Sequence, residues 1–311
     1  MLRPQEIISQ HAPPRGLTDW RIGSPANIAA ITACYLAAGV FAFVAWQFTG
    51  NDAWVNEFFG GPAALLMIWL AALQLSLSLK ATRFFVSDDL LRPGWMLITL
   101  SAGCQFVGSI LSQVLGVNSS LNPLMLRSGR PDWLILEFRH IGLGIGGTLR
   151  FALLSAGLHY AVKAYRKHGL LSPLKFIDTL VLACMVSYIG RNVADIVFAI
   201  AHGKHPDAWE LLGWPTDPMI GLLLAQALLL LRSAQKMGTG VFARCWKAFS
   251  VGVFLTALGD VGQWATNYGY LPHPWDALTW YLWLPAAAAF ACAPAFQLEV
   301  IRKAGISANR S

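Results

Sequence analysis

Eight long apolar stretches constrain the fold of this chain more than any other sequence feature. They cover residues 28–49, 62–79, 94–116, 135–162, 176–201, 216–231, 248–268 and 277–298. A helix of about 20 apolar residues crosses a bilayer, and a helix satisfies its own backbone polar groups where no water is available. The sequence therefore predicts an all-α, polytopic integral membrane bundle of eight transmembrane helices. Because the sixth stretch is short and the fourth is long, seven spans are the alternative.

The composition excludes a soluble globule. Hydrophobic residues make up 56% of the chain and charged residues 13%, and the mean hydropathy is +0.51. Soluble domains carry roughly 25% charged residues. The connections between the stretches are too short for a separate catalytic domain. We expect a cytoplasmic tail over residues 1–27, a single bundle domain over 28–300 and a second cytoplasmic tail over 301–311.

The distribution of basic residues predicts the topology. Of the 23 Lys and Arg residues, 17 lie in the two tails and in every second connector. The other connectors contain Arg127, Arg130 and Lys204. The positive-inside rule then predicts eight spans with both termini in the cytoplasm, as in a bacterial inner-membrane protein. The net charge of +7 is thus a topology signal, and no nucleic-acid partner is expected.

A glycine stands at the end of each helix predicted to run outward. These residues are Gly50, Gly116, Gly203 and Gly269, and each is placed like a C-terminal cap. The next helix follows after a short loop in each case. The pattern predicts four helical hairpins.

Four charged residues fall inside the predicted spans near the middle of the membrane. They are Arg150, Arg191, Asp195 and Asp260. A charge at the bilayer centre costs about 2.5–3.5 kcal/mol on insertion scales, so such residues face the protein interior and pair. Arg191 and Asp195 are four residues apart and therefore share one helical face.

The seventh predicted helix carries a polar stripe that continues toward its outer end. Thr256, Asp260, Gln263 and Asn267 recur at helical spacing. We predict a ligand-binding site or ion pathway formed by Arg150, Arg191, Asp195, Asp260, Gln263 and Asn267. The alternative is a dry salt-bridge lock that specifies helix packing.

Aromatic residues concentrate on the predicted outer side. The set comprises Trp54, Phe58, Phe59, Trp133, Trp209, Trp214, Tyr268, Tyr270, Trp275, Trp280, Tyr281 and Trp283. An interfacial belt predicts Trp on both sides of the bilayer and does not explain this asymmetry. Because acidic residues lie nearby, the outer face is a candidate site for a small-molecule or cationic ligand.

Histidine, cysteine and glycine residues are the remaining candidates for cofactor chemistry in the sequence. His140 and His202 lie near the same membrane surface and are the candidate axial ligands of one haem b. Otherwise no cofactor, no metal site and no catalytic residue is predicted, and the five cysteines are expected to be buried. Gly142, Gly144 and Gly147 match GxGxxG, but they lie in a membrane helix and follow no strand. Gly142 and Gly146 predict close helix packing that also leaves space beside Arg150.

The leading interpretation is an integral membrane binding or sensor-type protein with a polar, charge-paired interior that opens to the outer face. The first alternative is a secondary transporter or proton-coupled carrier that uses Asp195 and Asp260 as titrating groups. The second is a non-catalytic subunit or assembly factor that binds a partner within a membrane complex. All three place the lipid bilayer around the bundle.

Overall fold

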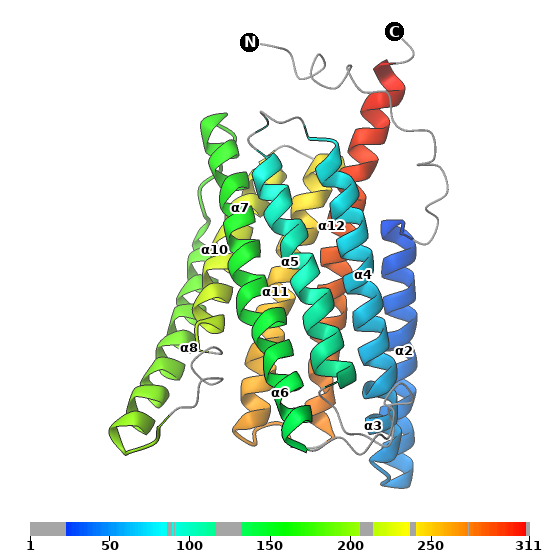
Figure 1. The fold of residues 1–311 in the computed structure, drawn as a ribbon, viewed down its shortest axis with the longest axis vertical. Helices are drawn as coiled ribbons and strands as arrows, with labels where there is room; N and C mark the ends of the chain where they lie inside the picture. Colours follow the sequence, from blue (N-terminus) through cyan, green and yellow to red (C-terminus); the bar gives the residue numbers. More distant parts are fainter. Residues whose placement is uncertain are drawn as a thin grey trace.

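A computed structural model describes residues 23–85, 89, 91–115, 132–205, 214–236, 241–272 and 274–308. Throughout these ranges the regular secondary structure is helical, as the apolar stretches predicted (Figure 1). The predicted tail residues 1–22 and 309–311, Gly116, Arg127, Arg130 and Trp209 lie outside the described residues, as does the side chain of Asn267.

The long helices run back and forth along one axis (Figure 1). They are α2 (Pro25–Thr49), α4 (Gly61–Arg83), α5 (Arg92–Ile110), α7 (Arg150–Lys167), α8 (Phe176–Ala201), α10 (Thr216–Lys236), α11 (Val241–Asn267) and α12 (Trp280–Ala308). Shorter elements extend or join them: α3 (Ala53–Phe59), the π-helical η2 (Leu111–Leu115), α6 (Asp132–Leu143), the π-helical η3 (Gly144–Leu149) and the 3₁₀ helix η4 (Trp275–Thr279).

Seven helical segments of the described chain are long and apolar enough to cross a membrane. They correspond to seven of the predicted stretches, and the fourth is one continuous rod made of α6, η3 and α7. The remaining stretch, 248–268, belongs to α11, which is long enough to span a bilayer but less apolar than these seven segments. The predicted all-helical bundle is thus confirmed, with seven candidate membrane-spanning helices in the described chain, and the count of eight spans stays a prediction.

Helix ends follow from local sequence. Before α2, the Ser24 hydroxyl accepts a hydrogen bond from the Asn27 N–H at 3.3 Å, and Pro25 occupies the first helical position. Gly50, Gly203 and Gly269 all have positive φ angles just after a helix, a conformation that glycine adopts without a steric penalty. These three predicted helix-terminating glycines are confirmed.

We call the end where α2 begins and α12 finishes the terminal end, and the opposite end, where α3 lies, the distal end (Figure 1). Helix α11 packs against α10 and α12, and α5 packs against α4 and α7. Trp95, Trp246 and Phe249 are fully buried where these helices meet. The largest buried side chains thus stabilise the terminal half.

Glycines bring α5 and the α6–η3 segment into backbone contact. A Cβ atom at Gly108 would lie 2.5 Å from the Gly146 Cα, and one at Gly142 would lie 2.5 Å from the Ser112 nitrogen. No larger residue fits at such a distance. The predicted close packing at Gly142 and Gly146 is therefore confirmed, and a nucleotide has no room there.

Helix α8 lies at the edge of the bundle and leans away from it toward the distal end (Figure 1). It packs chiefly on α10, and only 6% of its most apolar 18-residue window is buried. Cys184 on α8 and Cys34 on α2 are exposed, which corrects the expectation that all the cysteines are buried. Both lie on helices whose apolar outer faces suit contact with lipid.

Candidate functional site

Cavities lie between the helices of the described chain, and three of those in the distal half are lined by predicted site residues or border such a cavity. The α8–α11 cavity, of about 530 Å³, is bounded by α8, the start of α10 and the end of α11. The central cavity, of about 190 Å³, is bounded by α4, α5, η2, α6, η3, α7, α11 and α12. The α3–η4 cavity, of about 350 Å³, lies among α3, η4 and their neighbours.

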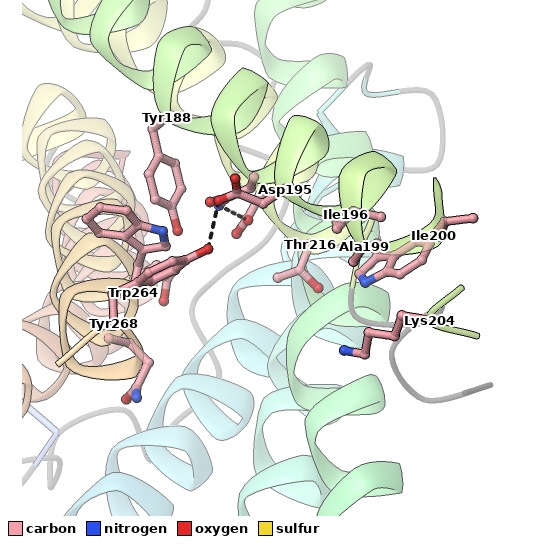
Figure 2. Close-up of a pocket in the computed structure, with 14 residues that line it drawn as sticks. Tyr188, Asp195, Ile196, Ala199, Ile200, Lys204, Thr216, Trp264 and Tyr268 are labelled. Carbon is pink, nitrogen blue, oxygen red and sulfur yellow. Dashed lines mark hydrogen bonds between the residues drawn. The ribbon is translucent and has the colours of Figure 1, made fainter. Parts of the chain in front are cut away.

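Asp195 carries the polar contacts on the α8 side of the first cavity. Its Oδ2 accepts a hydrogen bond from the Tyr268 hydroxyl at 2.7 Å, as Figure 2 shows. The Arg191 Nε lies 3.7 Å from the same oxygen. The predicted pairing of Arg191 with Asp195 along one helical face is therefore present within α8. The hydrogen bond from Tyr268 to Asp195 links α8 to the end of α11.

Aromatic rings from α8 and from the end of α11 line one side of this cavity. The Arg191 guanidinium carbon lies 5.4 Å from the Trp264 ring centroid and 5.9 Å from that of Tyr268. Tyr188 meets Trp264 edge to face at 6.2 Å, and Figure 2 shows these three rings on one side of the cavity. A cation over such rings is attracted by their negative faces. The Arg191 guanidinium thus occupies the cation-binding face of these rings.

A second acid group of this cavity was not among the predicted site residues. Asp217, in the first turn of α10, accepts a hydrogen bond from the Asn192 side chain at 2.7 Å. In the sequence, Asp217 is the second residue of the predicted stretch 216–231. Its position at the start of an apolar stretch is the signal for a helix N-terminus, which favours acidic residues.

The contact with Asp195 changes the acidity of Tyr268, which lies just beyond α11. The carboxylate accepts the tyrosine proton in a hydrogen bond and repels the charged phenolate, so the pKa of Tyr268 lies above its ordinary value. Tyr268 therefore remains a hydrogen-bond donor to Asp195 at neutral pH.

The central cavity contains Arg150, of which 8% is exposed. Its guanidinium carbon lies 4.9 Å from the Phe151 ring centroid and 5.1 Å from that of Phe290. Its Nε is buried and has no hydrogen-bond partner within the described chain. Asp260 attracts it electrostatically, although the two side chains do not form a direct ion pair in the described structure.

Asp260 lies on the wall between the α8–α11 cavity and the central cavity. The Trp283 indole ring packs against the neighbouring Gly259 and interacts favourably with the Asp260 carboxyl group. Its Oδ2 is buried and, among the described residues, has no partner. Gly259 makes room for this arrangement, because a Cβ atom there would collide with the Trp283 ring. Asp260 is thus accessible to two separate spaces.

The predicted site residues divide between these spaces. Asp195, Asp260 and Gln263 line the α8–α11 cavity, and Arg191 lies beside it. Arg150 lines the central cavity with Asp260. The depths also differ from the expectation of one shared level. Asp195 lies six residues before the end of α8 and Asp260 seven before the end of α11, whereas Arg150 is near the middle of its rod.

The histidines give no further support for haem. His202 stacks on Phe198 with ring centroids 3.9 Å apart, and its Nδ1 lies 2.8 Å from the Phe198 carbonyl oxygen. His140 lies on α6. A haem between His140 and His202 stays a prediction. In the described ranges, no group of three or more His, Cys, Asp or Glu residues is placed to hold a metal ion.

A different acid–base pair joins α8 to α10 at the terminal end. The Arg232 Nε donates to the Asp178 Oδ2 at 2.7 Å, and its Nη2 donates to the Oδ1. The Lys175 backbone N–H also donates to Asp178 at 2.7 Å and so caps the start of α8. This bidentate contact holds one end of α8 in place.

Comparison of the chain with protein-family models, with curated proteins and with solved structures found no match.

Proposed function

We propose that this chain is an integral membrane binding protein of the sensor type, and that its ligand enters the α8–α11 cavity from the distal face. The observation that carries the proposal is the lining of this cavity. Asp195, Asp217 and Asp260 contribute carboxyl groups, and Lys204 contributes the basic group. A cavity of about 530 Å³ is within the range of roughly 300–1,000 Å³ that small-molecule sites occupy.

The ligand that best fits this lining is a small organic cation. The excess of carboxyl groups favours positive charge, and the rings of Tyr188, Trp264 and Tyr268 favour an ammonium or guanidinium group. Arg191 already places such a group over Trp264 and Tyr268. The ligand would take the place of the Arg191 guanidinium on these rings.

Helix α8 is the element that would report binding. It is held to α10 at the terminal end by Asp178 and Arg232, and it lies apart from the bundle at the distal end. A ligand that contacts α8, α10 and α11 together would favour the arrangement in which α8 lies closer to the bundle. Binding then shifts the population of α8 positions, which is what a sensor requires.

The proposal includes eight spans arranged as four hairpins, with both termini in the cytoplasm of a bacterial cell and the bundle in its inner membrane. It is supported by the basic residues at the terminal end, which include Lys80, Arg83, Arg166, Arg232 and Lys236. Labelling of single introduced cysteines in intact cells tests it. Lys204→Cys should react with a membrane-impermeant thiol reagent, whereas Lys236→Cys should not. The reverse result would overturn the topology.

Binding itself is measured by calorimetry on the purified protein in nanodiscs. The probe is phenethylammonium, and the neutral match is 2-phenylethanol. We expect phenethylammonium to bind and the alcohol to bind at least about tenfold more weakly, a difference of roughly 1.4 kcal/mol. Asp217→Asn should weaken phenethylammonium binding about tenfold. Glu57→Gln, an exposed acid on α3 that lines none of the three cavities, is the matched control and should not.

A proton-coupled carrier is the second candidate, because Asp260 lines two cavities on different sides of its side chain. Proteoliposomes separate the two. Uptake of phenethylammonium that depends on a pH gradient and disappears in Asp260→Asn would favour the carrier. Binding without uptake would favour the sensor. Equal binding of the charged and neutral probes would contradict both.

A further inference from the structure

The central cavity contains two opposite charges that do not neutralise one another directly. Arg150 and Asp260 both line it, and in the described structure they form no direct ion pair. The Arg150 Nε and the Asp260 Oδ2 are both buried, and neither has a hydrogen-bond partner among the described residues. Each charge therefore retains hydrogen-bonding capacity toward the cavity.

Such an arrangement is costly unless something fills the space between the two groups. Removing a charged group from water costs several kcal/mol when it is not paired and hydrogen-bonded. Cation–π contacts with Phe151 and Phe290 stabilise the face of the Arg150 guanidinium but leave its Nε–H, on the edge, without a partner among the described residues. A carboxylate is the group that matches this edge, because it accepts two parallel N–H bonds.

The hydroxyl groups around the cavity fit the opposite charge. Ser112 donates to the Gly108 carbonyl oxygen at 2.8 Å, and Thr256 donates to the Gly252 carbonyl oxygen at 2.9 Å. Since their protons are committed within their own helices, their oxygen atoms are left as acceptors. Together with the Asp260 carboxyl group, they suit an ammonium group.

The helices around this cavity are irregular exactly where they border it. The π-helical η2 contributes Ser112 and Gln113, and the π-helical η3 contributes Gly146 and Gly147. Single π-helical turns inside α-helices are frequent at functional sites, because the wider turn redirects backbone and side-chain groups. Two such segments on neighbouring helices, both facing one cavity, indicate a binding site.

We propose that the central cavity binds a small zwitterion, an α-amino acid with a short side chain, whose carboxylate contacts Arg150 and whose ammonium group contacts Asp260. The volume of about 190 Å³ is below the roughly 300 Å³ at which drug-sized sites begin, which selects a small molecule. This inference rests on Arg150, which lines the central cavity and does not line the organic-cation site between α8 and α11, whereas Asp260 lines both.

Entry to the central cavity is from the distal end. The central and α3–η4 cavities share Gln113, Trp280 and Trp283. The α3–η4 cavity is bordered by residues of α3 and η4, which lie at the distal end (Figure 1). The rings of Trp280 and Trp283 meet edge to face with centroids 5.9 Å apart, and a ligand would pass beside them to reach Arg150. The fluorescence of these tryptophans should therefore report its arrival.

The test compares three molecules of similar size on the unmodified protein in nanodiscs, by calorimetry and tryptophan fluorescence. L-Alanine carries both charges, propionate the negative charge and propylammonium the positive charge. We expect L-alanine to bind at least about tenfold more tightly than either singly charged molecule. Equal or tighter binding of propionate would overturn the zwitterion, as would absence of L-alanine binding.

Variants then locate the site. Arg150→Gln should weaken L-alanine binding at least about tenfold and leave phenethylammonium binding unchanged, whereas Asp217→Asn should do the opposite. If Arg150→Gln does not fold, Arg150→Lys keeps the charge but loses the two-pronged contact, and it should weaken L-alanine binding. L-Alanine binding that is insensitive to both Arg150 variants, or lost equally in Arg191→Gln, would place the ligand elsewhere and overturn the proposal.

Discussion

Each end of helix α8 carries an ion pair, and the two pairs differ in burial and geometry. At the terminal end, Asp178 and Arg232 pair in bidentate geometry, with 3% and 14% of their side chains exposed. At the distal end, Arg191 and Asp195 are 57% and 44% exposed, and their contact is a single one of 3.7 Å. One end of the helix is thus tied to its neighbour, whereas the other presents its charges to a cavity.

The difference teaches where rigidity and binding capacity are located. A buried pair resists change because removing one partner leaves the other uncompensated, at a cost of about 3–5 kcal/mol. An exposed pair contributes about 0–1 kcal/mol, so its members are free to exchange partners. The two halves of the bundle differ in the same way: large aromatic residues are buried in the terminal half, and cavities lie in the distal half.

The largest expected effect on stability comes from removing the ion pair between Asp178 and Arg232. Asp178→Asn should lower the free energy of unfolding by about 3 kcal/mol, because Arg232 loses its carboxylate partner in a buried setting. Thermal unfolding in detergent, followed by circular dichroism, measures this loss. Asp195→Asn is the matched control on the same helix. Equal losses in the two variants would remove the contrast between the two ends.

An intermediate effect on stability is expected where the middle of α8 contacts α10. A Cβ atom at Gly221 would lie 2.7 Å from the Ile189 Cδ1, so Gly221→Leu should push α8 away from α10 and destabilise the protein by about 1–3 kcal/mol. Phenethylammonium binding should also weaken. Gly190→Ala, with no atom within 4 Å of the added carbon, is the control. Unchanged stability in Gly221→Leu would mean that α8 does not rest on α10 here.

The smallest expected effect on stability comes from Asp195→Asn, which should change the free energy of unfolding by less than about 1 kcal/mol because both partners are exposed. The substitution should instead change the pKa of Tyr268. Without the carboxylate, the pKa of Tyr268 should fall toward its ordinary value of about 10. Titration of tyrosinate absorbance measures this shift, with Glu57→Gln as the control.

The sign of the associated pH dependence follows from the raised pKa of Tyr268. The contact between Tyr268 and Asp195 contributes fully below the ordinary tyrosine pKa of about 10 and is lost as the pH rises through the raised pKa. The tyrosinate absorbance of Tyr268 should therefore appear at a pH above 10 in the unmodified protein. A profile that is identical in Asp195→Asn would show that Tyr268 and Asp195 act independently.

Several site residues could be predicted because helical periodicity carries them. Asp260 and Gln263 line the same cavity because they are three residues apart on α11, and Asp195 joins them from an equivalent depth on α8. Asp217 and Asn192 were missed because their contact joins two helices, and no local pattern specifies which residues of separate helices meet. The same reason explains why Arg150 was grouped with Arg191 and Asp195, although it faces another cavity.

By itself, the sequence determined the class of the protein, the long apolar helices, the three described helix-terminating glycines and the close contact at Gly142 and Gly146. These features depend on composition and local spacing, which act within one or two turns of a helix. Tertiary structure alone decided that α8 lies apart, that Asp260 stands between two cavities, and that Arg150 is buried without a direct ion pair in the described chain. These depend on how helices distant in sequence pack together, which is set by the fit of entire helix surfaces.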